Sequence, residues 1–159
     1  MELHLIRHAA AEIPHSDLHD FERKLTFKGK DQAKILRKTL EALEVNYDLV
    51  LCSPWRRARE TASLLEPVAD KLEPCELLAQ APSLELKELI QDLASKHKAV
   101  ALVGHQPWIA ELTALLLTGD TNLVDKFEFR KCSLYALQWT PDQSFLRFVL
   151  PPGVLRKLR

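Results

Sequence analysis

The segment Leu3-His4-Leu5-Ile6-Arg7-His8-Ala9 decides the fold. Its apolar run predicts a β-strand that ends in an Arg-His pair. In an open α/β sheet, ligands bind beyond the carboxyl ends of the strands. Imidazole is a nucleophile and guanidinium is a bidentate phosphate clamp, so Arg7 and His8 at such an end suit attack on a phosphoryl group. Taken alone, such a pair is more often an ordinary polar strand end, because short motifs have a high false-positive rate.

The composition is that of a globular protein. The chain has 159 residues, of which 47% are hydrophobic and 28% charged, and we expect one domain over residues 1–159. Lys plus Arg and Asp plus Glu both number 22, so the net charge is zero and no global field favours nucleic acid or an anionic membrane. We find no signal peptide and no apolar run long enough to cross a membrane, which predicts a cytoplasmic protein.

Neither the cysteines nor the histidines form a metal-binding pattern. Cys52, Cys75 and Cys132 are far apart and lack a Cys-x-x-Cys pair, so free buried thiols in a reducing compartment are expected. His4 and His8 share one face of a strand but lie too far apart to share an ion easily. The sequence therefore predicts no metal and no cofactor.

Strands and helices alternate along the first half of the chain. A polar loop over residues 9–24 leads to a helix that begins after Thr26, a suitable N-cap. Gly29 in the first turn is unfavourable for a helix and indicates a close approach of another backbone segment. Residues 48–52 predict a strand, and Ser53-Pro54 turns it into a second helix with Pro54 at its first position.

The second half ends in a different pattern. The predicted elements are a weak strand at 75–78, a helix around 86–93, a buried strand at 99–103, a helix from Gly104-His105-Gln106-Pro107 to about Leu117, strands at 133–139 and 145–150, and a short basic tail. Together these elements predict an α/β three-layer sandwich, with a mostly parallel central sheet flanked by helices and a C-terminal β-hairpin.

Three predicted strand ends carry chemically active residues. They are followed by Arg7-His8, by Ser53-Pro54-Trp55-Arg56-Arg57-Ala58 and by Gly104-His105. Because the carboxyl ends of parallel strands lie on one rim of a sheet, two histidines and at least one arginine are expected to converge there. Trp55 and Trp108 are expected in the core or the pocket wall.

These segments resemble a known family. Leu5-Ile6-Arg7-His8-Ala9, Ser53-Pro54-Trp55-Arg56-Arg57-Ala58-Arg59-Glu60-Thr61 and Val103-Gly104-His105-Gln106-Pro107 resemble the three signatures of the histidine phosphatase superfamily, in order and at comparable spacing. Within it, Arg23-Lys24-Leu25-Thr26-Phe27-Lys28-Gly29 resembles the SixA-type phosphohistidine phosphatases. The similarity runs from Met1 to about Leu117 and includes the hairpin in outline, which implies a phosphoglycerate mutase-like fold.

The resemblance implies a role for each matching residue. His8 matches the nucleophile that forms a covalent phosphohistidine, and His105 matches the second histidine, which donates to a phosphoryl oxygen. Arg7 and Arg57 match the phosphate-binding arginines, and Arg23 joins them from the loop. Arg56 and Arg59 are expected to be surface charges. The implied function is a metal-independent phosphatase acting on phosphohistidine of a protein.

The sequence also departs from the family pattern. Ala9 replaces the more usual glycine, and Lys24 replaces a common proline, which makes the placement of Arg23 the least secure. Larger members carry an acidic general acid after the second motif, but Glu76, Glu85 and Glu88 are expected on the surface.

Two other functions stay open. The first is a small-molecule phosphomonoesterase that acts on a small phosphate compound and uses Glu12, Asp17 or Asp20 from the loop as its acid. The second is a catalytically silent phosphate-binding or protein-interaction module. The pair His8 and His105 argues against this second function, because loss of catalysis is expected to erode the nucleophile first.

Overall fold

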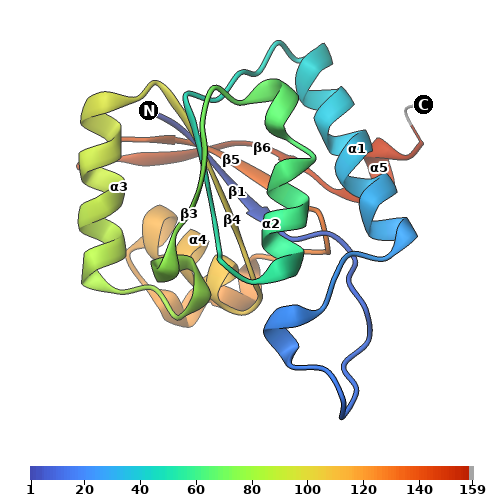
Figure 1. Ribbon diagram of the computed structural model, residues 1–159. Coiled ribbons are helices and arrows are strands. Elements are labelled where there is room, and N and C mark those ends of the chain that lie inside the picture. Colours follow the sequence, from blue (N-terminus) through green and yellow to red (C-terminus); the bar gives the residue numbers. More distant parts are fainter. Residues whose placement is uncertain (158–159) are drawn as a thin grey trace.

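The computed structural model describes residues 1–157 and contains a six-stranded sheet in the order β3-β2-β4-β1-β5-β6 (Figure 1). The strands are β1 (Glu2–Arg7), β2 (Leu49–Cys52), β3 (Leu72–Pro74), β4 (Ala99–Gly104), β5 (Leu134–Trp139) and β6 (Ser144–Leu150). Neighbouring strands from β3 to β1 run parallel, whereas β5 pairs antiparallel with β1 and with β6. The mostly parallel sheet and the terminal hairpin are therefore confirmed.

Helices cover both faces of this sheet. The α-helices are α1 (Phe27–Ala42), α2 (Arg56–Ser63), α3 (Leu84–Lys96), α4 (Trp108–Thr118) and α5 (Pro152–Leu155), and the 3-10 helices are η1 (Asp20–Glu22), η2 (Glu66–Val68), η3 (Glu76–Ala79) and η4 (Thr121–Lys126). Residues of α1, α2 and α5 share one buried cluster, and residues of α3 and α4 share the other. The result is the predicted three-layer sandwich. No helix within residues 1–157 is both long and apolar enough to cross a bilayer.

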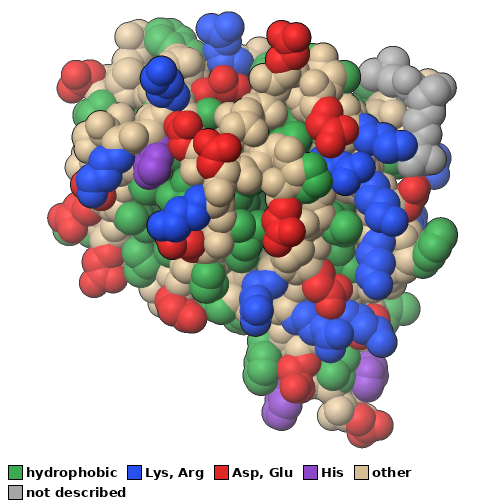
Figure 2. Space-filling view, turned by 45° about the horizontal axis from the view of Figure 1, so that its top comes forward, with side chains coloured by type: hydrophobic (Ala, Val, Ile, Leu, Met, Phe, Trp, Pro, Cys, Tyr) green, Lys and Arg blue, Asp and Glu red, His purple; other side chains and the backbone are tan. Residues whose placement is uncertain are grey.

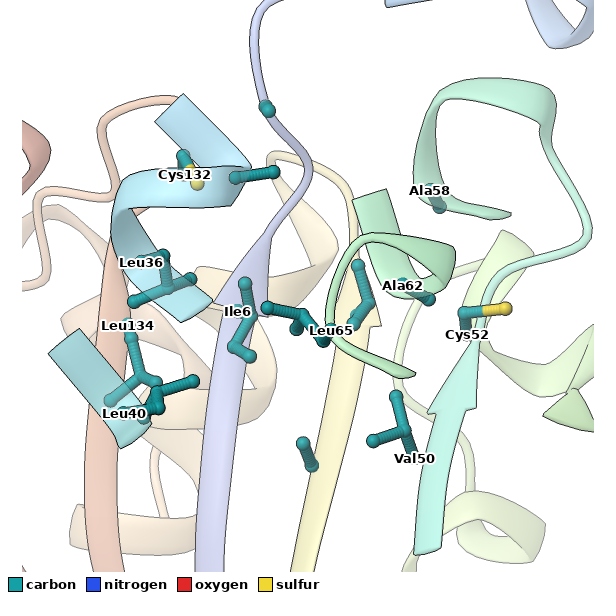
Figure 3. Packing of buried hydrophobic residues seen from close by; sticks show 14 of the residues in the cluster. Ile6, Leu36, Leu40, Val50, Cys52, Ala58, Ala62, Leu65, Cys132 and Leu134 are labelled. Carbon is teal, nitrogen blue, oxygen red and sulfur yellow. The ribbon is translucent and has the colours of Figure 1, made fainter. Parts of the chain in front are cut away.

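The alternation of side chains along β1 explains how one strand serves two cores. Leu3 and Leu5 belong to the cluster under α3 and α4, whereas Ile6 belongs to the cluster under α1 and α2. Figure 3 shows Ile6 among Leu36, Leu65 and other residues of that second cluster. With core on both faces, β1 is fixed in register, and so is the position at which it ends.

The start of α1 anchors the loop that follows β1. The Thr26 side chain accepts a hydrogen bond from the Gly29 N–H, as expected of an N-cap, and its own backbone N–H donates to the Ala10 carbonyl at 2.9 Å. A Cβ on Gly29 would lie 1.9 Å from that same Ala10 oxygen. Gly29 therefore permits the close backbone approach that its position predicted.

Two local predictions are wrong, and one short helix was not predicted. Cys75 to Leu78 is not a strand, because β3 ends at Pro74 and Glu76–Ala79 forms a 3-10 helix. Pro54 is not the first residue of the second helix; Trp55 is the N-cap, and α2 begins at Arg56. The expected tail includes the short helix α5, which packs Leu155 into the core.

Candidate active site

A cavity of about 370 Å³ opens where β1, β2 and β4 end. Its lining residues are Arg7, His8, Asp20, Arg23, Trp55, Arg57, His105, Gln106, Trp108 and Lys131. Arg7 is the last residue of β1, Arg57 lies in the first turn of α2, and His105 directly follows β4. The structure thus brings together Arg7, His8, Arg57 and His105 from the three strand ends, and Arg23 lies with them.

The hydrogen bonds of His8 fix its tautomer. The side chain is buried, and its Nδ1 lies 2.8 Å from the Ala9 carbonyl oxygen. A carbonyl can only accept, so Nδ1 carries the proton and donates it. Nε2 consequently carries the lone pair, and it accepts a hydrogen bond from Nε of Arg57 at 3.1 Å. The nitrogen with the free electron pair therefore faces the guanidinium of Arg57.

Both histidines of the cavity are neutral near pH 7. Burial lowers the pKa of His8 to about 3, and the positive charges of Arg57 and Arg7 act in the same direction. Burial also lowers the pKa of His105 to about 3, again aided by Arg57. Desolvation and like charge both disfavour a protonated imidazole. The lone pair on His8 is therefore available throughout the neutral range.

Two buried polar atoms of the cavity lack a partner within residues 1–157. Nε2 of His105 lies 2.6 Å from the Ser53 hydroxyl, but its Nδ1 is unpartnered. One terminal nitrogen of Arg7 donates to the Phe129 carbonyl at 2.6 Å, whereas its Nε is unpartnered. Buried polar groups without partners are costly. An acceptor would satisfy Nε of Arg7, and Nδ1 of His105 in the tautomer in which that nitrogen carries the proton.

Asp20 holds two of the arginines. Its Oδ2 accepts from Arg57 at 3.0 Å, and its Oδ1 accepts from Nε of Arg23 at 2.7 Å. Arg23 also donates to the Glu12 carbonyl at 2.6 Å. Partial burial pushes the pKa of the Asp20 carboxyl upward, but Arg57 and Arg23 outweigh it and hold this pKa below its ordinary value. Asp20 is therefore ionised, and it orients the guanidinium groups.

The three loop carboxyl groups differ in their relation to the cavity. Asp20 lines it, but Glu12 and Asp17 do not. Glu12 accepts from the backbone N–H of Lys24, and Asp17 is exposed and accepts from the Ser16 hydroxyl. Asp20 is thus the carboxyl group in the cavity lining within residues 1–157, and it is held in the ionised form.

Some lining residues and contacts were not found from the sequence. Ser53 contacts His105, and its position directly after a strand was a usable signal. Lys131 reaches the cavity from a loop far along the chain, where no pattern marks it. The next residue, Cys132, explains the placement, because its N–H lies 3.1 Å from the carbonyl oxygens of both Arg7 and His8.

The arginines, the histidine and the cysteines that were expected to take no part in catalysis lie outside the cavity lining. Arg56 is exposed and pairs with Glu60 at 2.7 Å, and Arg59 is exposed. His4 is fully buried, with Nδ1 2.6 Å from the Tyr47 hydroxyl. Cys52 and Cys132 are buried free thiols, and Cys75 is a partly buried one. Within residues 1–157, no group of three His, Cys, Asp or Glu side chains could hold a metal ion.

The comparisons with known proteins agree with this arrangement. Residues 3–80 match the family model described as histidine phosphatase superfamily (branch 1). An uncharacterized protein of Picosynechococcus sp. is 31% identical over 126 residues, which cover 77% of this chain and 76% of that protein. The phosphohistidine phosphatase SixA of Escherichia coli is 29% identical over 129 residues, which cover 76% and 77%.

Solved structures share the fold over nearly the whole chain. The protein histidine phosphatase SixA complexed with tungstate has a TM-score of 0.85 at 22% identity, covering 98% of this chain and 99% of that one. The alpha-ribazole phosphatase from Shigella flexneri has a TM-score of 0.77 at 19% identity, covering 96% and 97%. The same fold thus occurs in proteins whose names state different substrates, so it does not select the substrate of this chain.

Proposed function

The chain belongs to the histidine phosphatase superfamily, and on this basis we propose that it removes the phosphoryl group from phosphohistidine on a protein, through a covalent intermediate on His8. One observation carries the proposal. His8 presents an unprotonated Nε2 to Arg57 inside a cavity that also holds unpartnered polar atoms of Arg7 and His105. The free thiols suit a reducing compartment, and we assign the protein to the cytoplasm.

In the proposed first step, Nε2 of His8 attacks phosphorus. A bond forms between Nε2 and phosphorus, the bond between phosphorus and the substrate imidazole breaks, and its electron pair leaves with that imidazole. Water then attacks the same phosphorus in line; the bond between phosphorus and Nε2 of His8 breaks, and its electron pair returns to Nε2. The protons of the water leave on the inorganic phosphate, so His8 regains its starting form. The hydrogen bond from Nδ1 to the Ala9 carbonyl stabilises the positive charge that develops on the ring.

The cationic groups supply the electrostatic stabilisation. Arg57 donates to Nε2 in the free protein, and in the proposed complex it transfers that donor to a phosphoryl oxygen. Arg7 and His105 offer further donors from fixed positions, and Arg23 contributes charge at the wall of the cavity. Such preorganised groups stabilise the charge on the equatorial oxygens without rearranging during the reaction. No step in this scheme requires a metal ion or a cofactor.

The ionised state of Asp20 favours substrates whose leaving group is a nitrogen atom. An alkyl ester would expel an alkoxide about as basic as hydroxide, whose conjugate acid has a pKa near 15.7, and this departure calls for a general acid. A ring-protonated phosphohistidine expels neutral imidazole, whose conjugate acid has a pKa of about 6.5. Because Asp20 is held ionised by two arginines, it is a poor proton donor. Substrates with P–N bonds are therefore favoured.

The test is a ratio of specificity constants, measured in the presence of a chelator. Phosphohistidine and phosphoramidate are compared with glycerol phosphate and a hexose phosphate at one pH. We expect the P–N substrates to be preferred by at least about 100-fold, the typical contribution of a general acid that is missing here. Comparable rates on the alkyl esters, lost in an Asp20→Asn or Glu12→Gln variant, would instead establish a small-molecule phosphomonoesterase.

A further inference from the structure

A second, larger hollow lies beside the active site. Its volume is about 790 Å³, roughly twice that of the catalytic cavity, and it is bounded by η1, α1 and α2. We call it the α1–α2 groove. Four cationic side chains line it, with two acidic ones: Lys30, Lys34, Arg56, Arg59, Glu22 and Glu60. The local balance is positive, although the whole chain has a net charge of zero.

Half of this positive charge is balanced by Glu22 and Glu60, which leaves the lining with a net charge of +2. Glu60 pairs with Arg56 at 2.7 Å and also accepts from the Leu25 N–H at 2.8 Å. Lys30, Lys34 and Arg59 form no ion pair within residues 1–157. Figure 2 shows Lys and Arg side chains gathered along the side of the molecule that carries α1. The groove therefore offers an anionic ligand three cationic side chains that form no ion pair within residues 1–157, with Glu22 as the carboxylate nearby.

The groove and the active site share their walls. On α2, Arg57 points into the catalytic cavity while its neighbour Arg56 lines the groove. On η1, Asp20 faces the cavity and contacts Arg57, whereas Phe21 lines the groove and is 52% exposed. The two hollows share no lining residue but adjoin the same two elements, so an extended segment that crosses η1 and α2 reaches both.

We propose that the α1–α2 groove docks acidic residues flanking the phosphohistidine of the substrate protein. The occupant is a polypeptide because the cations are spread over two helices and accompany an exposed aromatic ring, a spacing that suits several side chains of an extended segment. Opposite charges at such a surface contribute modestly to affinity and strongly to partner choice. This inference rests on the proposed function, because it assigns the partner of the same site.

The experiment uses two synthetic phosphohistidine peptides of equal length. One has Asp and Glu around the phosphohistidine, and the other has Asn and Ser; phosphoramidate is the small substrate. We expect wild type to prefer the acidic peptide about tenfold in kcat/KM, which corresponds to about 1.4 kcal/mol, or two exposed ion pairs. High salt should weaken the preference, because it screens exposed charges.

Charge reversal tests the location. The Lys34→Glu/Arg59→Glu variant should lose the preference for the acidic peptide and keep its rates on the neutral peptide and on phosphoramidate. Lys87→Glu/Lys98→Glu is the matched control, since both lysines are exposed outside the groove and the net charge changes equally. The control should behave as wild type.

Each other outcome overturns the inference. If wild type shows no preference, or if the groove variant retains it, the acidic residues do not dock there. An equal loss on phosphoramidate means that the groove acts on small anions or on the catalytic site itself. If the protein hydrolyses phosphoramidate but neither peptide, the groove does not dock a peptide substrate, although the protein is still a phosphatase. If the protein hydrolyses neither peptide and no phosphoramidate, the proposed function itself is wrong.

Discussion

Acidification should destabilise this protein well before its carboxyl groups titrate. The pKa of about 3 for both His8 and His105 lies far below the value of 6.5 expected in the unfolded chain. Between these values the unfolded state binds more protons than the folded state, so stability is present above pH 6.5 and falls as the pH decreases towards 3.

The magnitude follows from the two pKa values. Lowering the pH from 7 to 5 should remove about 2 kcal/mol for each histidine, or about 4 kcal/mol in all, from the free energy of unfolding. That is a large share of the roughly 5–15 kcal/mol typical of a domain. The carboxyl groups with lowered pKa values, Glu2, Asp20 and Asp48, contribute only nearer pH 4 and below, so the window from pH 6.5 to 5 isolates the histidines.

The assay is urea unfolding followed by circular dichroism at closely spaced pH values. Each single variant, His8→Gln or His105→Gln, should retain about half of the pH dependence, and the double variant should retain little. His15→Gln is the matched control, because this histidine is exposed in the loop. An equally steep fall in the double variant would show that the neutral, buried histidines are not its source.

Three further predictions concern the site and its support. Arg57→Lys keeps the charge but loses the planar fork, so kcat/KM for phosphoramidate should fall roughly 100-fold, the scale of one oxyanion donor, while Arg56→Lys leaves it unchanged. Gly29→Ala should lower the free energy of unfolding by about 1–3 kcal/mol, because its Cβ would overlap the Ala10 carbonyl, and Gly153→Ala, with open space around it, should not. Brief incubation with labelled substrate and a quench in base should leave acid-labile phosphate on His8; label retained in a His8→Ala variant would contradict the assignment.

The sequence predicted those elements in which burial governs the pattern. The strand at 99–103 is apolar on both faces, and β4 has core on both sides in the structure. Thr26 and Gly29 were interpreted correctly, since capping and close backbone contact are local properties. The strand predicted at 75–78 failed because so short a segment, with only Leu77 and Leu78 adjacent and apolar, fits a 3-10 turn as well as a strand.

The arrangement of the cavity was only partly predictable. The strand ends place Arg7, His8 and His105 together whenever the sheet is parallel, so topology alone suffices for them. The loop over residues 9–24 has no periodicity, and nothing in it indicates that Asp20 binds Arg57 and Arg23. Such contacts depend on the path of the loop, which is determined by long-range packing and not by local sequence.

The group that sets the tautomer of His8 is a main-chain carbonyl, and this makes the reactive form of the imidazole robust to mutation. Every amino acid at position 9 would supply the same carbonyl oxygen, so no substitution there removes the acceptor. A carboxylate acceptor, in contrast, is lost when its aspartate or glutamate is replaced. The alanine at position 9 is fully buried, and its N–H donates to the Thr61 hydroxyl, so packing holds the peptide in place. As long as His8 is present, the unprotonated state of its Nε2 therefore depends on the path of the main chain. Substitutions elsewhere remove it by displacing the end of β1.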